Sequence, residues 1–209
     1  MKYTSLHPDE IRQKVYEEAK KQFLEKGIAN TEMKQIAQTV GIGRTTLYRY
    51  YPSIHRLAFM AATQIWDDLY MGIVEKGIEE WKTGYEILCA FYEELVEKIA
   101  VRPRELLFFS QFDAIFQPPS FPDFPEAEEY KEHLIRVLEF MEKLVQKGQA
   151  DGSLRKDVDV IERLNGISHA LMGYEQRTAL YPAEWRLPGK DTMHWMARCM
   201  LRDLKGQEG

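Results

Sequence analysis

Gly41 separates two short apolar stretches whose spacing fits helices rather than strands. Four residues before it, Ala37 is small enough for two helices to cross closely, and glycine itself tolerates the positive φ of a tight turn. The apolar positions on both sides are those that a helix-turn-helix buries: Ile36, Val40, Ile42, Leu47 and Tyr50. Residues 33–52 therefore predict two helices around a tight turn, with the second free to enter a DNA major groove. The same spacing also fits an ordinary helical hairpin.

The side chains left outside the second of these helices are of the kinds that contact DNA. With the apolar positions turned inward, four residues face outward and Thr46 lies at the margin: Arg44, Thr45, Tyr48 and Arg49. Arginine can donate two hydrogen bonds to a guanine edge or to a phosphate, and hydroxyl groups form hydrogen bonds with phosphate oxygens. The stretch therefore fits a groove between two phosphate backbones. The alternative is a solvated basic helix with one aromatic core residue.

Charge is distributed unevenly along the chain. Residues 1–56 contain ten Lys and Arg against six Asp and Glu, although the whole protein has a net charge of −5. A basic first quarter on an acidic body is typical of a small polyanion-binding module joined to a larger domain. A solvated face is the alternative explanation for so small an excess.

The rest of the chain also has helical periodicity, so we predict an all-α fold. Further helices are expected over residues 8–26, 54–76, 83–100, 103–116, 126–148, 157–180 and 190–204. Thr31 is the predicted N-cap of the helix that Gly41 ends. Four prolines within residues 117–125 are incompatible with a helix, and this segment is predicted to be a loop.

Several classes of protein are disfavoured by the sequence. It has no apolar run long enough for a transmembrane helix and no secretory signal, so we expect a cytoplasmic protein that does not associate with membranes. Cys89 and Cys199 lie far apart, and we expect two reduced thiols, with a structural disulfide as the alternative. No phosphate loop, nucleophile elbow, HExxH or CxxC motif occurs, so no enzymatic activity, cofactor or metal is expected.

The segment GIANTEMKQIAQTVGIGRTTLYRYYPSIHRL, residues 27–57, resembles the TetR family of bacterial transcriptional regulators. The matching features are the Gly27-Ile28 pair, the threonine at 31, the Ile-Ala pair at 36–37, the Gly-Ile turn at 41–42 and the helix end at 46–51. The resemblance covers about a quarter of the chain. The remaining chain agrees with the family in its helical layout.

The resemblance implies two domains: a helix-turn-helix DNA-binding domain over residues 1–53, and a helical effector-binding and dimerisation domain over residues 54–209. The implied function is that of a ligand-responsive regulator, specifically a repressor that a lipophilic small molecule releases from its double-stranded DNA operator. The DNA-binding candidates are Thr31, Gly43, Arg44, Thr45, Thr46, Tyr48, Arg49, Tyr50 and Arg56. The alternatives are a cytosolic helical protein that binds lipophiles but not DNA, and a small helical enzyme.

Some positions depart from the family pattern. Gly43 stands where serine usually caps the recognition helix, and glycine is a weaker cap. Thr45 replaces a smaller residue, which predicts an altered base preference, and Gln35 replaces an acidic residue. Ile54 stands where the family has a lysine that contacts phosphate, so that role is assigned to Arg56 instead.

Dimerisation through the last two helices is also implied by the resemblance, and those helices have broad apolar faces. The apolar positions are Ile161, Leu164, Ile167, Leu171, Met172, Met193, Met196, Met200, Leu201 and Leu204. Periodicity alone does not distinguish a dimer contact from the core of one protomer. The Met-rich face of the final helix favours a homodimer, because a monomer would expose it.

Aromatic residues are frequent in the predicted C-terminal domain, and a pocket between its helices is the expected site for a small lipophilic effector. The ligand-binding candidates are Trp66, Tyr70, Phe112, Asp113, His169, Tyr174 and Glu175. For any one aromatic residue the alternative is ordinary core packing, and His169 also fits a core histidine. The carboxyl groups of Asp113 and Glu175 favour a cationic effector, since a buried carboxylate needs a partner.

Overall fold

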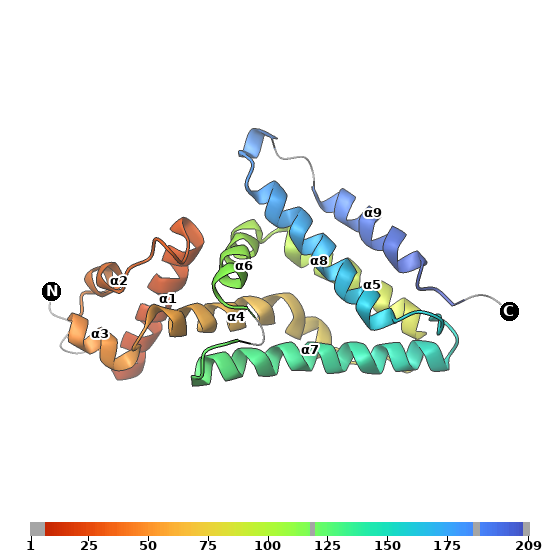
Figure 1. Cartoon of the computed structure of the whole chain (residues 1–209), viewed down its shortest axis with the longest axis horizontal. Helices are drawn as coiled ribbons and strands as arrows, with labels where there is room; N and C mark the ends of the chain where they lie inside the picture. The colour runs from red at the N-terminus through yellow and green to blue at the C-terminus, as the bar shows by residue number, and fades with distance from the viewer. Residues whose placement is uncertain (1–6, 118–119, 186–188, 207–209) are drawn as a thin grey trace. The chain divides into compact units, whose positions relative to one another are not determined.

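The computed structural model describes residues 7–117, 120–185 and 189–206. Within these ranges the chain forms nine α-helices and one short 3-10 helix (Figure 1). The only β-type pairing there is an isolated bridge between Leu154 and Lys205. The predicted all-α fold is therefore confirmed. No helix in the described part is both long and apolar enough to cross a membrane.

The helices lie close to the ranges predicted from periodicity. In chain order they are α1 (Pro8–Lys26), α2 (Met33–Val40), α3 (Arg44–Tyr50), α4 (Ile54–Val74), α5 (Gly84–Ala100), α6 (Pro103–Ile115), α7 (Pro125–Ala150), α8 (Val160–Ala179), η1 (Ala183–Trp185) and α9 (Gly189–Arg202). The proline-rich segment contains no helix in its described residues until α7 begins at Pro125, as its composition predicts.

Contacts divide the chain into two units. Unit 1 comprises Met1–Ile65 and Leu107–Glu132, and unit 2 comprises Trp66–Leu106 and His133–Gly209. Helices α4, α6 and α7 each contribute residues to both units. The predicted domain boundary after residue 53 falls inside unit 1, and it stays a prediction.

The loop between α1 and α2 is fixed by a glycine and a threonine. Gly27 ends α1 with φ 87° and ψ 163°, a conformation that side chains with a Cβ rarely adopt. The hydroxyl of Thr31 donates to the carbonyl oxygen of Gly27 at 2.8 Å, and Thr31 is buried. The residue that caps α2 is Glu32, without a side-chain hydrogen bond. The prediction of Thr31 as N-cap was therefore wrong, because its hydroxyl closes the preceding loop.

Aromatic packing forms the core of the later part of unit 1. The ring of Phe59 in α4 lies 4.8 Å from the rings of both Phe112 and Phe116, and 5.3 Å from that of Phe124. Phe112 is fully buried and also stacks on Phe108. The end of α6, the start of α7 and the segment between them thus pack on the first half of α4.

In unit 2, α5, α8 and α9 pack against one another (Figure 1). Tyr92 of α5 is fully buried, and its hydroxyl donates to the carbonyl oxygen of Leu164 in α8 at 2.8 Å. Leu171 of α8 and Met193 and Leu201 of α9 complete this core with almost no exposed surface. The apolar stripes of the last two helices therefore serve mainly the interior of one protomer.

Candidate functional site

Helix α3 presents the outward face that its sequence predicts. Leu47 is completely buried, whereas Arg44, Thr45, Tyr48 and Arg49 are exposed and Thr46 is half-buried. Gly43 occupies the N-cap position with φ −71°, and it supplies no side-chain cap. One buried leucine therefore holds the helix against its neighbours and leaves four polar side chains in solvent.

The turn before α3 has the geometry expected of Gly41. This residue adopts the left-handed conformation, with φ 79° and ψ 30°, and its N–H donates to the carbonyl oxygen of Ala37 at 2.9 Å. The N–H of Ile42 donates to the same carbonyl at 3.0 Å. These two bonds terminate α2 and direct the chain into α3. Ile36 and Val40 are buried, as predicted for the core positions of a helix-turn-helix.

Two guanidinium groups flank the ring of Tyr50 at the end of α3. Those of Arg12, from α1, and Arg49 each lie 5.1 Å from the ring centroid, a distance typical of cation–π contact. Tyr50 is half-buried, so its ring is packed while its hydroxyl accepts a 3.4 Å hydrogen bond from Arg49. Sequence reasoning missed Arg12, because α1 meets α3 only in the folded unit.

Arg56, predicted to replace the family's phosphate-binding lysine, is engaged within unit 1. Its Nη1 lies 3.5 Å from Oε1 of Glu126 in the first turn of α7, and its guanidinium lies 5.5 Å from the ring of Phe124. The other oxygen of Glu126 is buried and finds no hydrogen-bond donor among the described residues. A phosphate contact by Arg56 would compete with this carboxylate.

The sequence of the helix-turn-helix region matches a known protein family. Residues 15–59, from within α1 to the start of α4, match the family model described as bacterial regulatory proteins, tetR family. This segment is therefore a DNA-binding region of the TetR-family type. Members of this family are DNA-binding transcription regulators, not enzymes; they bind operators as dimers and respond to ligands. The predicted family and helix-turn-helix motif are thus confirmed.

Solved structures share the fold of this chain over nearly its whole length. PfmR from Thermus thermophilus is 19% identical, with 93% of this chain and 99% of that chain covered and a TM-score of 0.66. The MbdR regulator from Azoarcus sp. CIB is 18% identical, with 93% and 98% covered and a TM-score of 0.68. The ketosteroid transcriptional regulator KstR2 of Mycobacterium tuberculosis is 17% identical, with 94% and 95% covered and a TM-score of 0.62. None of the curated proteins matches the sequence.

Only some of the predicted ligand-binding residues of the regulator are brought together. The rings of Trp66 and Tyr70 in α4 are 4.3 Å apart, and the Tyr70 hydroxyl donates to Sδ of Met172 in α8 at 3.6 Å. Burial raises the pKa of Tyr70, so its hydroxyl stays protonated. Phe112 and Asp113 belong to unit 1 instead.

The carboxyl candidates have different environments. Glu175 is buried in α8, and one of its oxygens lies 3.3 Å from the hydroxyl of Thr178. Asp113 is exposed, so the expectation that it is a buried acid was wrong. Unit 2 contains a further pair that no motif indicates, in which Nδ1 of His133 in α7 contacts Oδ1 of Asp67 in α4. Their separation in the chain hides this pair from motif analysis.

His169 lies on the exposed side of α8. An interior position, whether as a core histidine or in a pocket wall, was therefore the wrong expectation for this residue. Gly166 and Gly173 are also exposed, and their spacing of three and four residues from His169 places all three on one face of the helix. The reason for the error is that periodicity identifies the apolar face of a helix but not the residues bordering it.

The predicted dimer residues divide into two groups. Leu164, Ile167 and Leu171 are at most 3% exposed within one protomer, so they form its own core. The same is true of the buried positions Met193, Leu201 and Leu204 in and just after α9. The remaining positions are partly exposed: Ile161, Met172, Met196 and Met200. Trp195, which sequence reasoning missed, is 65% exposed on α9.

Proposed function

We propose that this regulator is a homodimeric repressor, acting in the cytoplasm, that binds its operator through α3 and releases it when a lipophilic ligand binds. The DNA-binding role is assigned to residues 1–53, and effector binding and dimerisation to residues 54–209. The observation that carries the proposal is the polar outer face of α3, held in place by the buried Leu47. In a major groove, Arg44 at the first turn would reach base edges, and Tyr48 would reach a phosphate.

Other candidates of the DNA-binding set have supporting roles in this proposal. Thr45 and Arg49 are exposed beside the recognition residues and complete the contact surface. Gly43 allows the backbone at the start of α3 to approach DNA closely. Tyr50 positions Arg49 through its ring. Thr46, Thr31 and Arg56 are kept as candidates, with Thr31 turned toward Gly27 and Arg56 toward Glu126.

Selection of duplexes from a random library tests the DNA-binding role. A dimer should enrich an inverted repeat whose half-sites are spaced by about one helical turn. Arg44→Ala should lower discrimination at particular base pairs by about 1–3 kcal/mol. Arg136→Ala, an exposed arginine on α7, is the matched control and should select the same sequence. Failure to enrich any sequence, or an unchanged preference in Arg44→Ala, contradicts the proposal.

Homodimerisation is supported by the outer faces of α8 and α9. A Cβ at Gly166 or Gly173 would meet no atom within 4 Å, so the packing of one protomer does not require glycine at either position. Glycine within a helix costs about 1 kcal/mol relative to alanine, and two such residues on one face favour close approach of another helix. Trp195 and Cys199 are exposed on α9 beside the half-buried Met196. A second copy would cover these side chains.

A lipophilic effector is supported by the aromatic residues of unit 2, chiefly Trp66 and Tyr70 with Tyr174 and the buried acid Glu175. His169 and Asp113, which are exposed, and Phe112, which belongs to unit 1, do not support this site. Because a buried carboxylate is stabilised by a positive partner, the effector is proposed to be a lipophilic cation. Binding would release DNA only to the extent that the effector prefers the conformation with lower operator affinity.

Three probes with ten-carbon chains and different head groups test this proposal by calorimetry. Decyltrimethylammonium should bind more tightly than decanol or decanoate. Glu175→Gln should weaken the binding of the cation more than the binding of the alcohol. Glu139→Gln, at an exposed acid on α7, is the control and should leave all three affinities unchanged. Tightest binding by decanoate, with indifference to Glu175→Gln, would contradict the assignment of a cationic effector.

A further inference from the structure

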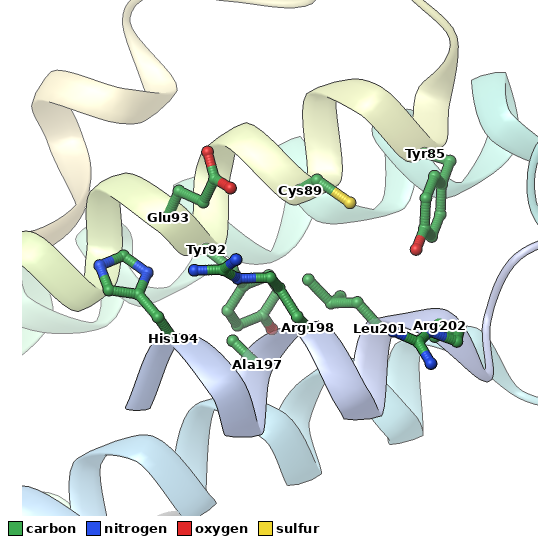
Figure 2. A pocket seen from close by; sticks show the side chains of 9 residues that line it. All are labelled: Tyr85, Cys89, Tyr92, Glu93, His194, Ala197, Arg198, Leu201 and Arg202. Atoms are coloured by element: carbon green, nitrogen blue, oxygen red, sulfur yellow. The ribbon is translucent and has the colours of Figure 1, made fainter. Parts of the chain in front are cut away.

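A groove of about 260 Å³ lies between α5 and α9 in unit 2 (Figure 2). Its lining residues are Tyr85, Cys89, Tyr92, Glu93, His194, Ala197, Arg198, Leu201 and Arg202. Among the described residues, these two helices alone line the groove. None of its residues belongs to the predicted effector set or to the exposed faces proposed for dimerisation.

The floor of the groove is apolar and rigid. Tyr92, Ala197 and Leu201 are buried, and Tyr92 is held by hydrogen bonds from its hydroxyl to α8. A flat apolar body placed in the groove would therefore meet a preformed surface. This favours an organic ligand over a fully hydrated ion, because apolar surface gains free energy by leaving water.

The α9 wall provides two positive charges. Arg198 and Arg202 are exposed one turn apart, and within the described ranges neither has a carboxylate oxygen within 4.0 Å. One turn earlier on this helix, His194 lies 2.9 Å from an oxygen of Glu97, which also binds Lys190 at 2.5 Å. Glu97 is thus already engaged with two bases, whereas among the described residues no ion pair occupies the donors of Arg198 or Arg202.

The α5 wall provides neutral polar groups. Burial is the largest influence on Tyr85 and Cys89, and it raises the pKa of the phenol to about 12 and that of the thiol above its ordinary value. Both groups are therefore protonated at neutral pH and add no negative charge. Among the described residues of the lining, Glu93 is the only acid, so the charged side chains leave an excess of positive charge. Figure 2 shows Tyr85 and Cys89 on α5 across the groove from the arginines of α9.

We propose that this groove binds a small organic carboxylate. Its carboxylate group would lie between the guanidinium groups of Arg198 and Arg202, whose forked donors match two carboxylate oxygens. Its apolar body would lie over Tyr92 and Leu201, and the hydroxyl of Tyr85 would offer a further hydrogen bond. This site is separate from the proposed effector set and depends on neither DNA binding nor release.

The two cysteines make the site measurable in the full-length protein. Cys89 lines the groove, whereas Cys199 lies on α9 outside the lining, on the face proposed for dimerisation. Benzoate is the probe, and the rate of alkylation of each thiol by iodoacetamide is followed by peptide mass spectrometry. Bound benzoate should slow alkylation of Cys89 roughly tenfold at about ten times its Kd, because only the free protein reacts. The rate at Cys199 should not change.

Control ligands and variants test which features of benzoate and of the groove are needed for protection. Benzamide, with the same ring and no charge, and inorganic phosphate, with charge and no ring, should protect Cys89 far less than benzoate. Arg198→Gln/Arg202→Gln should abolish protection, whereas Arg163→Gln, an exposed arginine on α8, should retain it. Circular dichroism establishes that the variants remain folded. The proposal is overturned by equal protection from benzamide or phosphate, by protection that persists in the folded double variant, or by no saturable effect of benzoate.

Discussion

Replacing Gly27 with alanine tests how α6 holds the loop between α1 and α2. The residue has φ 87° and ψ 163°, and a Cβ built on it would overlap the side-chain amide of Gln111 in α6. That amide accepts a 2.9 Å hydrogen bond from the N–H of Ile28, which is almost fully buried. Alanine at this position therefore faces both an unfavourable backbone conformation and an occupied space.

The expected cost is the sum of two effects. A residue with a Cβ in this backbone region costs on the order of 1–3 kcal/mol. Displacing Gln111 leaves the N–H of Ile28 without its acceptor, which costs about 1 kcal/mol. Gly27→Ala should therefore lower the free energy of unfolding by about 2–4 kcal/mol. Gly77→Ala is the control, because Gly77 also has a positive φ, 71°, but a methyl group there would have no atom within 4 Å to displace. Its expected cost is about 1–2 kcal/mol.

Urea unfolding followed by circular dichroism, at one fixed protein concentration, measures these differences. The contact with Gln111 is isolated by repeating Gly27→Ala in a Gln111→Ala background, where its cost should fall by about 1 kcal/mol. The reasoning is refuted if Gly27→Ala costs no more than Gly77→Ala and has the same effect in both backgrounds. In that case α6 would not restrain the loop.

Three further predictions concern DNA contact, assembly and pH. Tyr48→Phe should weaken operator binding by about 1 kcal/mol across all operator variants if the hydroxyl binds phosphate, and fluorescence anisotropy with a set of duplexes would detect any sequence-dependent loss that contradicts it. Trp195→Glu should yield a folded monomer in sedimentation, whereas Trp81→Glu, at another exposed tryptophan, should stay dimeric. If both variants are dimers, the interface lies elsewhere. Hydrogen bonds from Arg155 lower the pKa of Asp157 to about 2. The stability they confer is thus present above about pH 4 and lost as the pH falls toward 2. Asp157→Asn should therefore reduce the change of the melting temperature with pH over that range.

The sequence was sufficient to predict features that depend on local spacing. The turn at Gly41, the burial of Leu47 and the exposure of Arg44 and Tyr48 all follow from residues within one short segment, where periodicity and turn chemistry act together. The helix bounds of the remaining chain follow from the same signals, because glycine, proline and capping residues mark most of the ends.

Features that depend on contacts between distant segments were not predictable in this way. His169 was expected in the interior because it lies next to an apolar stripe, but its position on α8 leaves it facing solvent. Arg56 was assigned to phosphate by analogy of position, and its ion pair with Glu126 joins residues 70 positions apart. The Asp67–His133 pair was missed for the same reason. Such pairings become visible only when the helices are packed.

The set of helices that make up unit 1 bears on the proposed release of DNA. Its contacts extend beyond the helix-turn-helix to the second half of α6 and the first turns of α7. Gln111 of α6 holds the backbone of the loop before α2, and Glu126 of α7 holds Arg56 in the first turn of α4. We infer that an effector need not act through a long chain of contacts. A shift of α6 or α7 would change the support of the DNA-binding helices at these two hydrogen-bonded positions, and the free energy of those bonds would contribute to the coupling between ligand and operator binding.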